Sequence, residues 1–128
     1  MQVVLDTHSL LWFIMGDNRL SRNVRTIIED LDNRVLLSVG SLWEIAIKVN
    51  IGKLTLLRAY PELFPAELQK NEIEILPIRH KDLTTLATLS LHHRDPFDRL
   101  IIAQAINDNI AIATKDGAFQ DYPVQIIW

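Results

Sequence analysis

The stretch Val3-Val4-Leu5-Asp6-Thr7-His8 decides the fold. Its apolar run is short and partly β-branched, it ends at an acid, and an apolar stretch typical of a helix follows. This pattern predicts a buried strand of a parallel sheet. Asp6 would then lie at the carboxyl end of that strand, where open α/β sheets place their ligands. Taken alone, the stretch favours a simpler role for Asp6, as the cap of the next helix.

Further apolar runs alternate with helical patterns along the rest of the chain. They predict strands at 34–38, 73–76, 110–114 and 124–127, and helices at 9–15, 21–31, 41–52, 61–71, 81–89, 95–107 and 118–121. Pro77 suggests that the strand at 73–76 lies near an edge, and Pro65 suggests that 61–71 splits into two short helices. The alternation predicts an α/β fold with a mostly parallel sheet and helices on both faces.

Helix ends and helix faces can also be predicted. Ser41 has the position of an N-cap, with Glu44 as its capping-box partner, and Asp95-Pro96 has the pattern of a strong helix start. Ser21 is expected to cap the helix at 21–31. The inward positions of two amphipathic helices are expected to be Val24, Ile27, Ile28 and Leu31 in the first, and Leu83, Leu86 and Ala87 in the second.

Composition sets broad limits on the class of protein. The chain has 128 residues, 48% of them hydrophobic, which suits one compact domain spanning 1–128. It has no cysteine, so disulfides and thiolate metal sites are excluded. No secretory leader and no bilayer-spanning stretch is visible, and we expect no membrane association and a cytoplasmic location. The net charge of −3 does not suggest a strong nucleic-acid binder, but a site that gathers acids would lower it.

Four acids occupy comparable places in this pattern. Asp6 and Asp116 follow apolar strands, Glu44 lies in the first turn after the second strand, and Asp98 lies in the first turn of the helix before the fourth. Carboxyl strand ends and the first turns that follow them converge on one edge of a parallel sheet. Asp98 joins them only if its helix runs the other way, with its N-terminus at that edge. Each acid singly has a simpler explanation as a cap, a dipole partner or a turn residue.

Acids brought together raise one another's pKa values unless a cation compensates them. Carboxylate oxygens select Mg²⁺ or Mn²⁺, and neither cysteine nor an i,i+4 histidine pair points to zinc. A divalent cation held by acids suits phosphoryl chemistry, since it neutralises phosphate oxygens and lowers the pKa of water. The pattern therefore favours a metal-dependent reaction at phosphorus.

Four stretches, at 5–12, 37–54, 92–105 and 113–116, also carry a family resemblance. The most specific are Trp43-Glu44-Ile45-Ala46-Ile47-Lys48 and Asp95-Pro96-Phe97-Asp98-Arg99. The sequence resembles a PIN-domain ribonuclease, specifically a VapC-type toxin of bacterial type II toxin–antitoxin systems. The resemblance extends over almost the whole chain, and the stretches follow the family's order.

The resemblance implies a PIN domain with a five-stranded, mostly parallel sheet flanked by helices. It assigns metal binding and catalysis to Asp6, Glu44, Asp98 and Asp116, with Mg²⁺ or Mn²⁺ as the cofactor. Thr114 would support the site, and Asp95 fits the pattern but is expected to act mainly as a cap. The implied function is a toxin that hydrolyses RNA phosphodiester bonds as an endoribonuclease, leaving 5′-phosphate and 3′-hydroxyl ends. A homodimer and a cognate antitoxin that covers the site are also implied.

The basic residues beside these motifs are candidate phosphate contacts, namely Lys48, Lys53, Arg94, Arg99 and Lys115. Ordinary surface pairing explains each of them equally well. His8, His92 and His93 could contact RNA, although a histidine near a loop is more often structural. We expect Trp12, Phe13, Trp43 and Phe97 to lie in the core or a dimer interface rather than to stack on bases.

Rival protein classes fit less well. A haloacid-dehalogenase-like phosphatase needs an acid two residues after Asp6, where His8 stands, and a response-regulator receiver needs one after the third strand, where Pro77-Ile78 stands. Two alternatives stay open: a PIN-fold nuclease of RNA processing, and a non-catalytic PIN module that binds RNA or protein. The four intact acids argue against the second.

Overall fold

Five parallel strands form one sheet in the computed structural model, which describes all residues from 1 to 128. The strands are β1 (Gln2–Leu5), β2 (Arg34–Ser38), β3 (Ile73–Leu76), β4 (Ala111–Ala113) and β5 (Ile126–Ile127). Their order in space is β3-β2-β1-β4-β5, and every neighbouring pair is parallel. The predicted fold class is confirmed, as is the edge position of β3.

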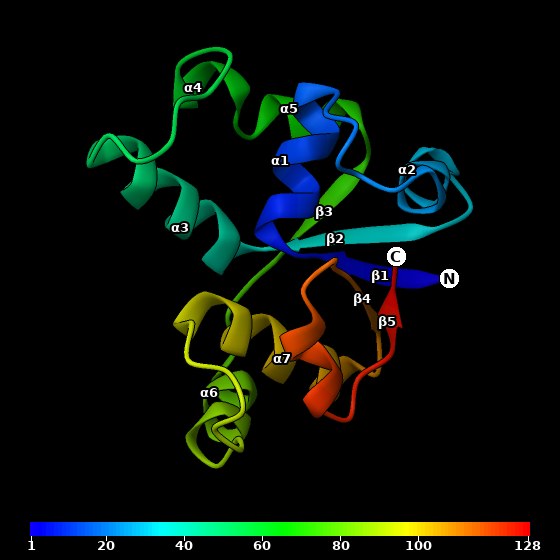
Figure 1. Ribbon diagram of the computed structural model, residues 1–128, viewed down its shortest axis with the longest axis vertical. Helices are drawn as coiled ribbons and strands as arrows, with labels where there is room; N and C mark the ends of the chain where they lie inside the picture. Colours follow the sequence, from blue (N-terminus) through cyan, green and yellow to red (C-terminus); the bar gives the residue numbers. More distant parts are fainter.

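Helices cover both faces of this sheet. One face carries α1 (Thr7–Met15), α2 (Arg22–Glu29), α3 (Val39–Asn50), α4 (Tyr60–Leu63) and α5 (Ala66–Lys70), and the other carries α6 (His80–Ala87) and α7 (Pro96–Asp108) (Figure 1). A 3₁₀ turn, η1 (Gly117–Asp121), follows β4. The predicted split of 61–71 at Pro65 is confirmed by the separation of α4 and α5. None of the helices combines the length and apolar character that crossing a membrane requires.

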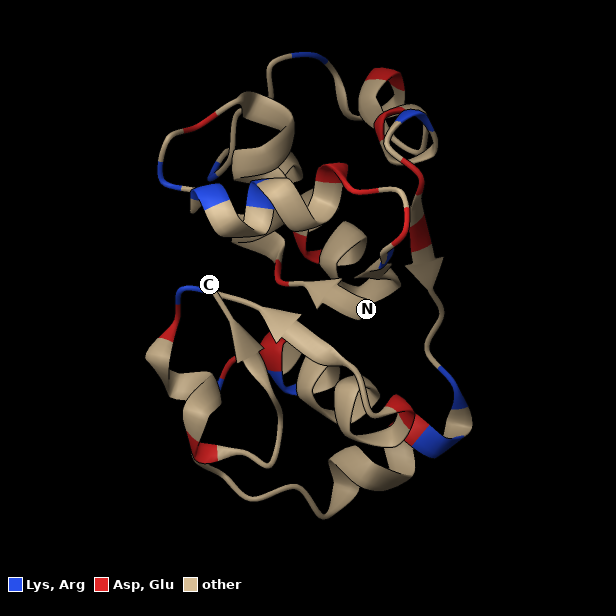
Figure 2. Cartoon of the chain, turned by 90° about the vertical axis from the view of Figure 1, so that its right-hand side faces the viewer, with Lys and Arg blue, Asp and Glu red and all other residues tan.

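The sheet separates two hydrophobic cores. Val3 and Leu5 point into the core beneath α1 to α5, while Val4, Leu36 and Ile112 point into the core against α7. Because both faces are buried, the strands need unbroken apolar runs, and this explains why they can be found in the sequence. Figure 2 shows the strands largely free of charge, with the charged residues mostly on helices and loops.

The start of α3 differs from the prediction. Ser38, the last residue of β2, is the N-cap, and its Oγ accepts a hydrogen bond from the Gly40 N–H at 3.1 Å. The predicted capping box of Ser41 with Glu44 is therefore wrong, and Ser41 is buried inside the first turn. The tight junction depends on Gly40, because a Cβ there would lie 2.6 Å from Leu100 Cδ2 of α7. The first turn of α3 thus packs closely on α7.

Three apolar side chains that were expected to face inward are exposed. Leu31 lies beyond the end of α2 and is 70% exposed, while Leu83 is 48% exposed and Ala87 is also exposed. On α6 the fully buried side chain is that of Asp82. Other predicted caps are confirmed, since Ser21 accepts from Val24 N–H, and the Asp95 carboxylate accepts from two N–H groups of the first turn of α7.

Asp82 joins α6 to α7 through a polar network. Its carboxylate accepts hydrogen bonds from the Arg79 guanidinium, with both contacts at 3.0 Å, and from the Asn107 amide at 2.9 Å. Arg79 also donates to Asp108 at 2.9 Å. Burial by itself would raise the pKa of Asp82, but the bonds from Arg79 and Asn107 outweigh it and lower that pKa below its usual value. Asp82 is therefore a paired structural charge.

Asp82→Ala should lower the free energy of unfolding at pH 7 by about 2–4 kcal/mol, because it leaves Arg79 and Asn107 without their shared acceptor. Urea unfolding followed by circular dichroism measures the change. Lys81→Ala, on the same helix, removes only an exposed ion pair with Asp108 at 3.3 Å; it is the control and should cost less than about 1 kcal/mol. A loss for Asp82→Ala no larger than the control would contradict the structural role of this network.

Candidate active site

Asp6 is fixed at the carboxyl edge of the sheet by three hydrogen bonds. Its backbone N–H donates to Ala113 O at 3.1 Å, which extends the β1–β4 pairing by one residue. Its Oδ1 accepts from the Ser9 N–H at 2.8 Å and caps α1, and its Oδ2 accepts from Thr114 Oγ1 at 2.6 Å. The capping interpretation and the edge position are therefore both correct, and one carboxylate does both.

Thr114 connects Asp6 to a second acid. Its Oγ1 donates to Asp6 and accepts a hydrogen bond from the Asp116 N–H at 3.0 Å. Asp116 Oδ1 then accepts from Ala118 N–H at the start of η1, and the Asp116 side chain is 48% exposed. The loop after β4 thus presents Asp116 to solvent beside the buried Asp6.

Asp98 reaches the same edge because α7 runs back toward it. α7 ends at Asp108 and β4 begins at Ala111, so a tight turn reverses the chain and leaves the N-terminus of α7 at the carboxyl edge. The condition that the sequence set for Asp98 is met. His93 Nε2 lies 2.8 Å from Asp98 Oδ2 and 3.8 Å from Asp116 Oδ2.

His93, Asp98 and Asp116 bring one ligand atom each to a common point. The three atoms lie within 4.8 Å of one another. The sequence predicts both acids as site residues, whereas for His93 it allows either an RNA contact or a structural role. Only its place five residues before Asp98, in the loop that leads into α7, hints at this position.

The environment of this edge raises the pKa of the Asp98 carboxyl group. Burial raises its pKa to about 6; its hydrogen bond with His93 opposes the rise, and the carboxylates of Asp95 and Asp6 add to it. Negative charge here is thus incompletely compensated by the protein. A bound cation would offset this negative charge. Mn²⁺ binds both carboxylate oxygens and imidazole nitrogen, whereas Mg²⁺ prefers the carboxylate oxygens. These residues therefore fit the divalent ion that the family resemblance implies.

Glu44 is held apart from that group of three. It is 4% exposed; its Oε1 accepts from Thr7 Oγ1 at 2.6 Å, and its Oε2 pairs with Lys48 Nζ at 2.7 Å. Thr7 Oγ1 also lies 3.0 Å from Ser41 Oγ, so α1 and α3 share a small buried polar cluster next to Asp6. Sequence reasoning missed Thr7, although its place directly after Asp6 could have drawn attention to it.

The basic residues near the site have different environments. Lys115 lines an open hollow of about 290 Å³ together with Asp6 and Asp116, and Arg94 is exposed in the loop before α7. Arg99 donates to the carbonyl oxygens of Ser90, His93 and Leu89 and to Tyr122 Oη. Its guanidinium thus holds the loop that carries His93, and this structural role was one of the two alternatives that the sequence left open for Arg99.

The fold and the site together define an α/β protein with an acid-lined carboxyl edge. The chain belongs to the PIN domain family, whose model matches residues 3–125. No curated protein sequence matches the chain. The family membership agrees with the resemblance carried by the motifs around Glu44 and Asp98.

Solved structures with the same fold include several complexes. The crystal structure of VapBC2 from Rickettsia felis bound to a DNA fragment from their promoter contains a chain that matches with a TM-score of 0.74 at 18% identity, covering 100% of this chain and 99% of that one. A chain of FitAcB from Neisseria gonorrhoeae matches with a TM-score of 0.69 at 20% identity, covering 98% of this chain and 96% of that one. A chain of DNA-bound VapBC from Salmonella typhimurium matches with a TM-score of 0.70 at 16% identity, covering 99% of this chain and 97% of that one. These likenesses establish the fold.

Asp98→Asn should stabilise the protein at pH 8. As the pH falls, Asp98 binds its proton at about pH 6 in the folded state but only at about pH 4 in the unfolded state. The charged form of Asp98 therefore costs stability above its pKa of about 6. The cost is roughly 2 kcal/mol after allowing for partial exposure, or a rise in Tm of a few degrees on substitution.

The gain from Asp98→Asn should be full at pH 8 and should vanish as the pH falls toward 4, where wild-type Asp98 is also neutral. Thermal unfolding at a series of pH values measures it. Glu62→Gln, on exposed α4, is a control that should show no such trend. A gain that persists unchanged at pH 4 would show that charge is not the cause.

Proposed function

We propose that the protein is a metal-dependent endoribonuclease that acts as the toxin of a toxin–antitoxin pair. The observation that carries this proposal is the meeting of Asp98, Asp116 and His93 at the sheet edge where Asp6 ends β1. In a PIN fold, such a group suits hydrolysis of phosphodiester bonds. The expected products carry 5′-phosphate and 3′-hydroxyl ends.

The acids would hold Mg²⁺ or Mn²⁺, with Asp6, Asp98 and Asp116 as the oxygen donors and His93 beside them. The ion would neutralise phosphate oxygens and make water more acidic. Glu44, predicted to belong to the same set, would complete the site from α3 only on exchanging its bonds to Thr7 and Lys48.

The remaining residues of the site would orient these acids and the substrate. Thr114 would fix the rotamers of Asp6 and the loop of Asp116, as its two hydrogen bonds indicate. Asp95 would set the first turn of α7 and thereby the position of Asp98. Lys115 and Arg94, both exposed, would contact the phosphates of the RNA.

The toxin role draws on the resemblance of the motifs to VapC-type proteins and on the fold shared with chains of VapBC complexes. A cognate antitoxin would then cover the acids until it is removed. Residues 1–128 would form one PIN domain acting on RNA in the cytoplasm. A homodimer is also proposed, and an apolar surface on α3, α6 and α7 supports it.

That apolar surface has Trp43 at its centre. Trp43 is 59% exposed and packs edge-on against Phe97, with ring centroids 5.4 Å apart. Ile78 and Leu83, which are 39% and 48% exposed, lie beside them around a small apolar hollow. Exposed apolar side chains in a cluster mark interaction surfaces. A partner copy would explain why Leu83 faces outward on α6.

Purified protein incubated with an RNA pool that includes tRNA and rRNA should cut specific sites when Mg²⁺ or Mn²⁺ is present. EDTA should abolish cleavage, and Asp6→Asn should reduce it more than about a hundredfold, since even groups that only orient metal ligands cost 10- to 100-fold. Thr114→Val, which removes only the orienting hydroxyl, should cost about 10- to 100-fold. Mapping of product ends and initial rates measures these effects.

Glu62→Gln, an exposed acid on α4, is the matched control and should cleave like the wild type. Cleavage that survives EDTA or Asp6→Asn would refute the metal-nuclease mechanism. Absence of cleavage by folded, antitoxin-free protein on the whole pool would favour a binding role instead.

Leu83→Glu should convert the protein from a dimer to a monomer, because it places a charge in the proposed apolar interface. Light scattering after size-exclusion chromatography measures the mass. Leu31→Glu, at an isolated exposed leucine on the other face, should leave the dimer intact. If the wild type is itself monomeric at micromolar concentrations, the homodimer proposal is wrong.

A further inference from the structure

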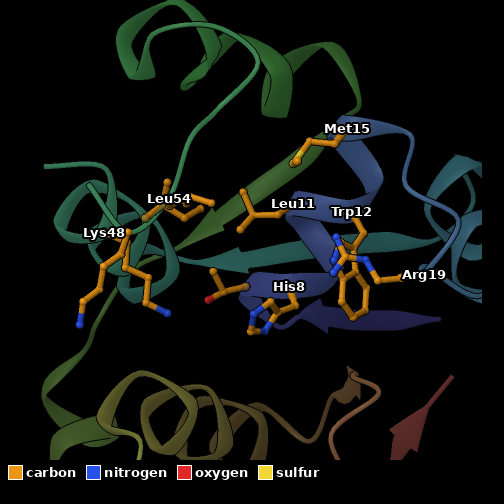
Figure 3. Close-up of a pocket in the computed structure, with 10 residues that line it drawn as sticks. His8, Leu11, Trp12, Met15, Arg19, Lys48 and Leu54 are labelled. Atoms are coloured by element: carbon orange, nitrogen blue, oxygen red, sulfur yellow. The ribbon is translucent and has the colours of Figure 1, made fainter. Parts of the chain in front are cut away.

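A hollow of about 390 Å³ lies beside the acids, between α1 and the C-terminal part of α3 with the loop that follows it. Figure 3 shows Leu11, Trp12 and Met15 of α1 on one side, facing Lys48 and Leu54 across the hollow. The volume lies at the lower end of the range of about 300–1,000 Å³ found for pockets that hold small organic groups. It is large enough for one planar ring system and its attachment.

The hollow adjoins the candidate active site. His8 and Trp12 line it, and the same two side chains line the smaller hollow that contains Asp6, Lys115 and Asp116. A strand of nucleic acid that placed a phosphate at the acids would therefore have its neighbouring nucleotide at the mouth of this hollow.

The chemistry of the lining suits a nucleotide. Three basic side chains line the hollow above an apolar floor that includes Leu11 and Ile45. One of them, Arg19, is paired with the Asp17 carboxylate at 2.6 Å. Lys53 is exposed and forms no ion pair, whereas Lys48 shares its charge with Glu44. Arg19 lies over the Trp12 indole at 5.2 Å, so a cation and an aromatic ring are already placed together. Sites for single-stranded nucleic acid combine such cations with aromatic rings on which bases stack.

The charge lining this hollow differs from that lining the apolar surface around Trp43. The net charge of the chain is −3, and two of the three basic residues at the hollow are paired with acids, so Lys53 supplies its uncompensated positive charge. Phe97 and Trp43, on the opposite side of the site, have no comparable cations lining their hollow. Charge therefore distinguishes the hollow at α1 from the apolar surface proposed as the dimer interface.

We infer that the hollow between α1 and α3 binds one unstacked base of the RNA strand, next to the phosphodiester at the acids. The inference rests on the proposed nuclease function and narrows its substrate class. A base can enter the hollow only when it is free of pairing, so the substrate is single-stranded RNA or a loop, and continuous duplex is excluded. Trp12 and His8 form the wall against which the base lies, and a base stacked on the Trp12 indole takes the place that Arg19 occupies at 5.2 Å from the ring centroid.

Photo-crosslinking tests the position of the base without requiring cleavage. A short single-stranded RNA with 5-iodouracil at one position at a time is bound to the wild-type protein in EDTA, irradiated and mapped by mass spectrometry. Crosslinks from at least one position are expected at Trp12 or His8, and a duplex of the same sequence should give few. Crosslinks confined to other parts of the protein, or equal yields from the duplex, would overturn the inference.

Steady-state kinetics on an RNA that the protein cuts provides a second test. Leu54→Trp should fill the hollow and raise KM about tenfold, with a smaller effect on kcat, since stacking of one base is worth this order of affinity. Leu57→Trp, at a leucine that is 69% exposed and outside this hollow, should leave KM unchanged. Equal effects of the two variants would overturn the base-binding role.

The cations can be tested in the same assay. Lys53→Ala should raise KM several-fold and make it less sensitive to salt, because one phosphate contact is lost. Lys70→Ala, an exposed lysine on α5 away from the hollow, is the matched control. If Lys53→Ala behaves like Lys70→Ala and Leu54→Trp has no effect, the hollow is left for a protein segment. The nuclease proposal would survive that result, since its own test depends on Asp6 and the metal.

Discussion

The hydrogen bond of 2.6 Å from Thr114 Oγ1 to Asp6 Oδ2 organises the whole carboxyl edge. It joins the ends of β1 and β4, neighbours in the sheet that are 108 residues apart in sequence. The same threonine oxygen accepts from Asp116 N–H, and the other oxygen of Asp6 caps α1. The two central strands, the first helix and the last acidic loop are therefore fixed by one carboxylate and one hydroxyl.

Two aspartates illustrate how partners divide structure from function. Asp82 is fully buried, but Arg79 and Asn107 surround it with donors, and its pKa is lowered. Asp98 is less buried and has only His93 as a close partner, and its pKa is raised to about 6. The first charge is neutralised within the protein, whereas the second is left open to a ligand. Uncompensated charge at a functional site costs stability, and proteins retain it where a ligand needs it.

The fold was predictable because both faces of the sheet are buried. A continuous apolar run marks β2 and an alternating pattern marks β3, at the predicted bounds 34–38 and 73–76. The start of α3 was misplaced because the helix begins directly after β2, with Ser38 as its cap and Gly40 against Leu100 of α7. Leu83 faces outward, while the polar Asp82 is buried by a partner from α7. A helical pattern alone contains no information about such partners.

Only the candidate site residues at the ends of predicted strands and helices could be found from the sequence. Asp6, Asp98 and Asp116 were selected from their positions at predicted element ends, but the place of His93 depends on how the loop before α7 folds. Trp12, expected in the core or a dimer interface, packs half-buried against the core and also lines both the acid-lined hollow and the hollow at α1. Because α1 begins at the capped Asp6, the same carboxylate that would bind the metal also sets the direction in which His8 and Trp12 project. The proposed reaction centre and the proposed base-binding hollow are therefore positioned by one helix start, and a change in that cap would move both together.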